Sequence, residues 1–133
     1  MELKEATIDY RDGDADLAGL LVWDGRELGH PGVLVVHGGA GLDDHARGRA
    51  RQLAKLGLLV FACDMYGKAV IGDRERVLSC LRELVADRDK LARRAQAGVE
   101  VLTAHPLLDG NIVAVGYCFG GGRSSSWREP AWI

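Results

Sequence analysis

The chain has 133 residues, of which 47% are hydrophobic and 27% are charged, and this composition is typical of one globular domain. Its formal net charge of −2 excludes the basic surface that nucleic-acid binding requires, and no apolar run reaches the roughly 20 residues that span a bilayer. The first five residues lack the apolar stretch of a signal peptide, so we expect a cytoplasmic protein with neither a membrane nor a nucleic-acid partner.

Two strands joined by a hairpin are predicted at the N-terminal end. Residues 5–10 and 17–23 have the pattern of strands, and the polar residues 11–14 between them are typical of a turn. After a loop at residues 30–32, the continuous apolar run 33–36 fits a strand buried on both faces, as in a parallel sheet.

A strand-helix-strand unit follows from this point. Residues 37–41 form a glycine-rich loop, and Asp43 or Asp44 can cap the helix after it. The apolar residues of that helix share one stripe: Ala46, Ala50, Leu53 and Ala54. Residues 58–63 form the next buried strand, so this order implies a right-handed parallel crossover.

Two further helices are predicted after Asp73, with a break near residues 86–89. The first has an apolar stripe made by Val77, Leu81, Leu84 and Val85. The second has a stripe made by Leu91, Ala95, Val99 and Leu102. Pro106 ends the second helix, Asp109 and Gly110 predict a turn, and residues 112–115 form a fifth strand.

The three cysteines, Cys63, Cys80 and Cys118, are odd in number and widely spaced. Without a Cys-x-x-Cys pair, they argue against a disulfide framework and against a structural zinc site, and we predict neither a metal nor a cofactor. Cys63 follows an apolar strand and Cys80 lies among helix-patterned residues, so we interpret both as packing residues.

The fifth strand runs into the most informative segment, Gly116-Tyr117-Cys118-Phe119-Gly120-Gly121. Gly-x-Cys-x-Gly-Gly after an apolar strand has the form of a nucleophile elbow with cysteine in place of serine. The glycines are needed because side chains at these positions would collide with the neighbouring backbone. Cys118 is therefore the predicted nucleophile, and it also needs a base and a group that orients the base.

Three motifs together resemble the dienelactone hydrolase family: the elbow, residues 35–42 and residues 63–67. The resemblance covers roughly residues 1–122 and implies an α/β-hydrolase fold. We expect a truncated three-layer α/β sandwich of about five strands, the later ones parallel. The family uses a Cys-His-Asp triad on a small-molecule ester or lactone substrate.

The resemblance assigns three site residues. Cys118 matches the nucleophile, the backbone N–H of Phe119 matches one oxyanion-hole donor, and the N–H of Gly39 best fills the position of the second. Gly38 stands where many members carry a glutamate. Oxyanion donors face the charge that develops on the carbonyl oxygen during the reaction.

The remaining polar candidates are interpreted as structural. His37 is expected to hold the loop of Gly39, and Asp64 to form hydrogen bonds within its own loop. His105 is expected at the opposite end of the sheet from the nucleophile. Three arginines are expected on a solvated helix face: Arg74, Arg76 and Arg82.

Residues 123–133 differ in character, since three serines and a proline stand where an apolar helix is expected. A one-base shift of GC-rich codons can turn this stretch into an apolar, helix-like sequence. We therefore predict that the tail is out of frame and that residues 1–122 are the N-terminal part of the hydrolase domain. Because the family's Asp and His follow the elbow, we expect this chain to be inactive and to self-associate through the exposed edge of the strand 112–115.

Two other functions stay open. A nucleotide-binding module is one, but Asp44 replaces the third glycine of a Gly-x-Gly-x-x-Gly pattern that begins at Gly39. The segment 116–121 has the spacing of a P-loop, but Gly122 and Arg123 replace its Lys and Ser/Thr. A non-catalytic interaction domain is the other alternative.

Overall fold

The computed structural model describes residues 2–68, 70 and 73–116. The described elements, in chain order, are β1 (Lys4–Asp12), β2 (Ala15–Trp23), β3 (His30–Val36), α1 (Asp44–Ala54), β4 (Leu59–Cys63), α2 (Arg74–Ala86), α3 (Arg88–Thr103) and β5 (Leu108–Gly116). Cys118, Phe119, the predicted boundary after residue 122 and the tail lie outside these described residues. None of the helices in the described part is long and apolar enough to cross a membrane.

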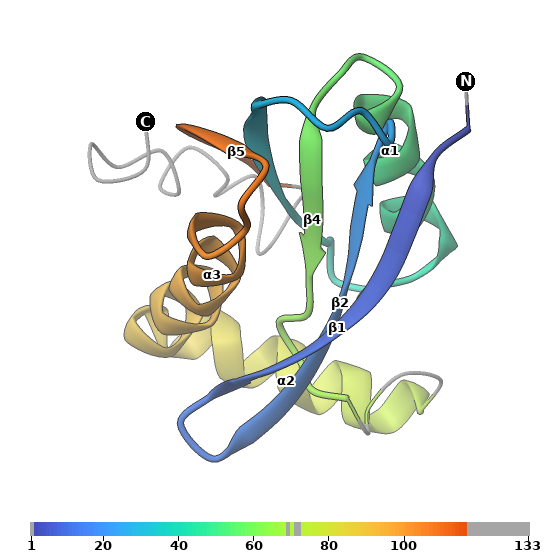
Figure 1. Cartoon of the computed structure of the whole chain (residues 1–133). Helices are drawn as coiled ribbons and strands as arrows, with labels where there is room; N and C mark the ends of the chain where they lie inside the picture. The colour runs from blue at the N-terminus through green and yellow to red at the C-terminus, as the bar shows by residue number, and fades with distance from the viewer. Residues whose placement is uncertain (1, 69, 71–72, 117–133) are drawn as a thin grey trace.

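The five described strands form one mixed sheet in the order β1-β2-β4-β3-β5. β1 pairs with β2 and β2 with β4 in antiparallel orientation, whereas β3 is parallel to both β4 and β5 (Figure 1). The predicted α/β class, with about five strands and the later ones parallel, is confirmed.

Helices cover both faces of this sheet (Figure 1). Leu34 and Val36 of β3 pack in a cluster with residues of α2 and α3, while Val33 and Val35 pack in a second cluster with the alanines of α1. The chain moves from β3 outward to β4 and then back past β3 to β5. Right-handed crossovers in opposite directions put their helices on opposite faces, which produces the predicted three layers.

Single aspartates define the helix boundaries. Asp43 caps α1, where its carboxylate accepts a hydrogen bond from the N–H of Ala46 at 3.1 Å. Asp87 ends α2 with its N–H bonded to the carbonyl of Glu83, and it caps α3 by accepting from the N–H of Lys90 at 3.1 Å. The break predicted near residues 86–89 is confirmed as this one shared residue.

The N-terminal hairpin is longer than predicted. Arg11 and Asp12 were expected in the turn but lie in β1, and the turn is reduced to Gly13 and Asp14, with Gly13 at φ 60°. Polar residues continue this strand because Arg11 pairs with Asp16 across the ladder and forms an ion pair with it at 3.1 Å.

The predicted loop at residues 30–32 and the predicted turn at Asp109 and Gly110 are wrong, because these residues lie in β3 and β5. The ladder between the two strands changes register between His30 and Gly32. Pro31, which has no N–H to donate, occupies that irregularity, and Gly110 adopts φ 104°. An irregular pairing thus lets turn-like residues remain in strands.

β5 pairs with β3 on one side, and no other strand in the described ranges pairs with its second side. Val113 of β5 is 47% exposed.

We expect concentration-dependent association of the chain through the edge of β5, because an unpaired apolar strand accepts another strand. Val113→Lys should weaken the association measured by sedimentation velocity. Leu56→Lys, at a 75% exposed leucine outside the strand, is the control, and an equal effect of both variants would contradict the expectation.

His30, at the first residue of β3, is fully buried, and both of its ring nitrogens face backbone carbonyl oxygens. Nδ1 lies 2.9 Å from the carbonyl oxygen of Gly57, and Nε2 lies 2.9 Å from that of Arg26. Carbonyl oxygens only accept, so both contacts become hydrogen bonds only when both nitrogens are protonated. Burial by itself lowers the pKa of His30, but the two carbonyls and the Asp24 carboxylate at 3.8 Å outweigh it and raise the pKa.

This raised pKa predicts a pH-dependent stability. Protonated His30 stabilises the fold fully below the unfolded pKa of about 6.5, and this contribution is lost as the pH rises through the higher folded pKa. In urea titrations, the free energy of unfolding should therefore fall as the pH rises above that value. His30→Gln should flatten this decline, whereas an unchanged slope would contradict the assignment. His37 and His105 have lowered pKa values and titrate in the more acidic range.

Candidate functional site

The carboxyl ends of β3, β4 and β5 meet at one edge of the sheet. Val36, the last residue of β3, is in register with Cys63 at the end of β4 and with Gly116 at the end of β5. In open parallel sheets this edge is where ligands bind. The loop of Gly39 therefore begins beside the point at which β5 ends, two residues before Cys118.

His37 joins the loop after β3 to the loop after β4. Its ring is fully buried, and Nε2 accepts a hydrogen bond from the N–H of Met65 at 3.0 Å. Because Nε2 accepts, Nδ1 carries the proton and donates to the carbonyl of Gly38 at 2.8 Å. Burial lowers the pKa of His37, which keeps the ring neutral. His37 thus has the loop-holding arrangement that was expected of it.

The same hydrogen bond orients the candidate donor at Gly39. The carbonyl of Gly38 and the N–H of Gly39 belong to one planar trans peptide and point in opposite directions. His37 and the N–H of Gly41, at 3.1 Å, both bind that carbonyl. The N–H of Gly39 is therefore directed away from them, and its hydrogen-bonding capacity is not used by any acceptor among the described residues.

Tyr66 fixes the other peptide of Gly39. Its hydroxyl donates to the carbonyl of Gly39 at 2.6 Å, and its ring packs edge to face on His37 with centroids 4.8 Å apart. Burial raises the pKa of Tyr66, so the hydroxyl stays protonated and keeps donating. The sequence placed Tyr66 in a family motif but indicated no role for it.

Asp64 holds the loop after β4 in place. Its carboxylate is almost fully buried and accepts from the backbone N–H groups of Tyr66 and Gly67, each at 3.0 Å, and of Ala18 at 3.2 Å. The expectation that Asp64 forms hydrogen bonds within its loop is confirmed.

Arg94 supports this loop from α3, and the sequence did not predict it. Its side chain is buried, where it donates to the carbonyl of Met65 at 2.9 Å and to the carboxylate of Asp12 at 3.0 Å. The only signal in the sequence is its position next to the apolar stripe of the helix. This arginine ties the N-terminal hairpin to the loop that binds His37.

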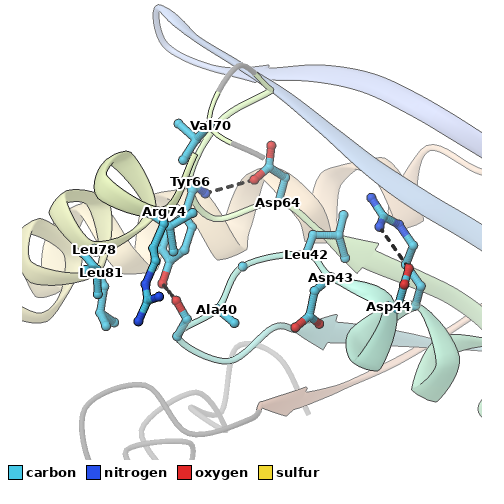
Figure 2. A pocket seen from close by; sticks show the side chains of 14 residues that line it. Ala40, Leu42, Asp43, Asp44, Asp64, Tyr66, Val70, Arg74, Leu78 and Leu81 are labelled. Atoms are coloured by element: carbon cyan, nitrogen blue, oxygen red, sulfur yellow. Dashed lines mark hydrogen bonds and ion pairs between the residues drawn. The ribbon is translucent and has the colours of Figure 1, made fainter. Parts of the chain in front are cut away.

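A cavity of about 620 Å³ lies at this edge of the sheet. Figure 2 shows Tyr66 directed at the loop of Ala40, with Leu78 and Leu81 of α2 beside it and Asp43 across the cavity. The described residues that line it are Gly39, Ala40, Gly41, Leu42, Asp43, Asp44, Arg47, Asp64, Tyr66, Val70, Arg74, Val77, Leu78 and Leu81. Gly39 thus lies in the wall of a space large enough for a small organic substrate.

Except for Arg74, the other candidate residues do not line this cavity. Burial raises the pKa of the Cys63 thiol, which suits a packing residue, and Cys80 is half-buried. His105 precedes β5 and packs against Trp23, at the amino ends of the parallel strands as expected. Arg74, Arg76 and Arg82 are exposed, and Arg74 also lines the cavity.

The start of α1 is poorly suited to a nucleotide phosphate. The Asp43 carboxylate already occupies one of its N-terminal amides, that of Ala46, and Asp44 adds a second negative charge in the first turn. A phosphate would be repelled by both groups, although helix N-termini bind anions when they are open. Within the described ranges, no group of three or more His, Cys, Asp and Glu side chains could hold a metal ion.

Comparison with known proteins gives a consistent result. The model of the dienelactone hydrolase family matches residues 17–126. The solved structure of a dienelactone hydrolase-like promiscuous phosphotriesterase from metagenomic libraries is 39% identical, with a TM-score of 0.82, over 90% of this chain and 51% of that one. A dienelactone hydrolase from Anabaena variabilis is 25% identical, with a TM-score of 0.68, over 93% and 56%.

A more distant structure, an acylaminoacyl peptidase from Pyrococcus horikoshii, shares the fold at 16% identity and a TM-score of 0.61, over 90% of this chain and 20% of that one. None of the curated proteins compared with the chain matches it. The chain spans about half the length of the two more similar solved structures.

Proposed function

The chain belongs to the dienelactone hydrolase family, and from that premise we propose that it carries the nucleophile and the oxyanion hole of a hydrolase that cleaves carboxylic ester or lactone bonds. Cys118 is the proposed nucleophile, and the N–H groups of Phe119 and Gly39 are the proposed oxyanion donors. The proposed partner is a small-molecule ester or lactone. A cytoplasmic location stays a prediction from the sequence.

The observation that carries the proposal is the oriented N–H of Gly39 in the cavity wall. His37 and Tyr66 hold the two peptides of Gly39. The register of Val36 with Gly116 supports a position for Cys118 at the same edge. A cavity, a motif-borne thiol and a preorganised donor are the parts that acyl transfer requires.

In the proposed reaction, the Cys118 thiolate attacks the carbonyl carbon and the negative charge moves to the carbonyl oxygen. The N–H groups of Gly39 and Phe119 stabilise that charge. Collapse breaks the bond to the leaving oxygen, which takes the proton that the Cys118 thiol gave up to the general base and departs as an alcohol, and a thioester forms on Cys118. Water then attacks the thioester, releasing the acid and the thiol. The second step needs a general base, which the family supplies as a histidine.

A chimera tests this proposal. It joins residues 1–122 to the portion of the metagenomic phosphotriesterase that this chain does not span. We expect the chimera to hydrolyse p-nitrophenyl butyrate and to show an acylated Cys118 by mass spectrometry after rapid acid quenching. The 133-residue chain alone should give no turnover above a heat-denatured control. An acyl group found on another residue of a folded, active chimera would overturn the proposal.

A further inference from the structure

The cavity beside Gly39 has an apolar wall on α2. Val77, Leu78 and Leu81 form this wall, which we call the α2 wall. A Cβ atom placed on Gly39 would lie 3.3 Å from Cδ2 of Leu81, so the Leu81 side chain borders the Cα of Gly39 at the inner end of the wall. Leu78, one turn nearer the start of the helix, is 42% exposed (Figure 2). An apolar surface therefore extends from Gly39, the proposed oxyanion donor, toward solvent.

Most charged groups around the cavity are already engaged within the protein. Asp43 caps α1, and Asp64 accepts hydrogen bonds from three backbone amides. Asp44 and Arg47 form an ion pair at 3.8 Å. Asp43 and Asp64 are held by backbone amides, and the exposed Asp44 faces Arg47, so the lining presents no single sign of charge to a ligand and favours an uncharged substrate.

Arg74 is the exception, since it makes no ion pair with another described residue. It lies in the first turn of α2 and is exposed to solvent. Attraction between exposed charges is weakened by water and by salt. Arg74 lines the same cavity as Gly39, but the carboxylates of Asp43, Asp44 and Asp64 line it as well and oppose the binding of an anion there.

We propose that the α2 wall binds the alkyl chain of an uncharged ester substrate, with the carbons nearest the carbonyl on Leu81 and the farther ones on Leu78. This inference rests on the proposed ester hydrolysis. The step from Leu81 to Leu78 is about 4.5 Å along the helix, roughly the length of three methylene groups. Leu78 therefore determines whether a longer chain is preferred over a short one.

Binding of uncharged amides to the 133-residue chain tests this inference. Straight-chain amides from acetamide to hexanamide resemble an ester substrate in shape, and they resist hydrolysis. In calorimetric or NMR titrations, we expect the dissociation constant to fall by about two- to fourfold for each added methylene. Leu78→Lys should remove the gain for the longest members. Val85→Lys, at a 51% exposed residue of α2 outside the lining, should keep the full series.

Two results would overturn the inference: a dissociation constant that does not change with chain length, and equal losses in the Leu78→Lys and Val85→Lys variants. A third would do so as well, namely tighter binding of hexanoate than of hexanamide with the difference lost in Arg74→Gln, because it would assign an anion site instead. The titrations use the Cys118→Ala variant, so they do not depend on the nucleophile. A failed chimera experiment therefore overturns the hydrolase proposal but does not determine how the amides bind. A failed amide series overturns the alkyl-binding inference but not the hydrolase proposal.

Discussion

Replacing Cys118 with alanine in the chimera is expected to lower kcat for p-nitrophenyl butyrate by on the order of 10⁴-fold. The proposed mechanism forms a thioester on this sulfur, and alanine has no atom that can attack the carbonyl. The oxyanion donors and the cavity remain in the variant, so KM should change much less than kcat. Steady-state kinetics with active-site titration of the wild-type chimera measures both constants.

The matched control for this experiment is Cys80→Ala. Cys80 is half-buried, and its Sγ lies 3.9 Å from the carbonyl of Tyr66, outside the proposed chemistry. Its variant should keep kcat within about a factor of two to three of the parent. An activity that survives in Cys118→Ala, with a cooperative melt like that of the parent, would remove Cys118 from the mechanism.

Replacing His37 with phenylalanine is expected to lower kcat of the chimera by about 10²-fold, which is the effect of losing one oxyanion donor. His37 orients the peptide that contains the N–H of Gly39, and phenylalanine cannot bind the carbonyl of Gly38. The variant also leaves the N–H of Met65 without its acceptor, at a cost of about 1–3 kcal/mol of stability, whereas the carbonyl of Gly38 keeps its bond from the N–H of Gly41. The loss should appear in kcat rather than in KM.

His30→Phe separates the positioning role from stability. Both histidines are fully buried on or beside β3 and use both ring nitrogens, but His30 begins the strand and His37 follows its end. Both variants should lower the midpoint of urea unfolding, and only His37→Phe should lower kcat. Equal losses of kcat in the two variants would mean that His37 acts through global stability alone.

The elements that sequence patterns predicted well are those with local causes. The stripe of alanines in α1, its aspartate cap and the break near residues 86–89 each arise within a few residues of chain. These features depend on periodicity and on capping chemistry, both of which are visible in a short window.

What the sequence could not predict depends on contacts between distant segments. Arg94 has the charge of a surface residue, yet it is buried because Asp12 and the carbonyl of Met65 meet it after folding. Tyr66 binds the carbonyl of Gly39 and packs on His37, and both contacts depend on the folded loops after β3 and β4 lying side by side. The residues around Pro31 form turns in most local contexts, and they belong to a strand here because the parallel ladder with β5 includes them.

The single-residue junction at Asp87 has a mechanical consequence for the cavity. α3 is fixed by Arg94 and by its apolar face on the sheet, and α2 leaves it with no spacer in which a displacement could be absorbed. The tilt of α2, and with it the width of the space between Leu81 and Gly39, is thus coupled to the position of α3 on the strands. A substitution at Asp87 should therefore alter that width without changing any residue that lines the cavity.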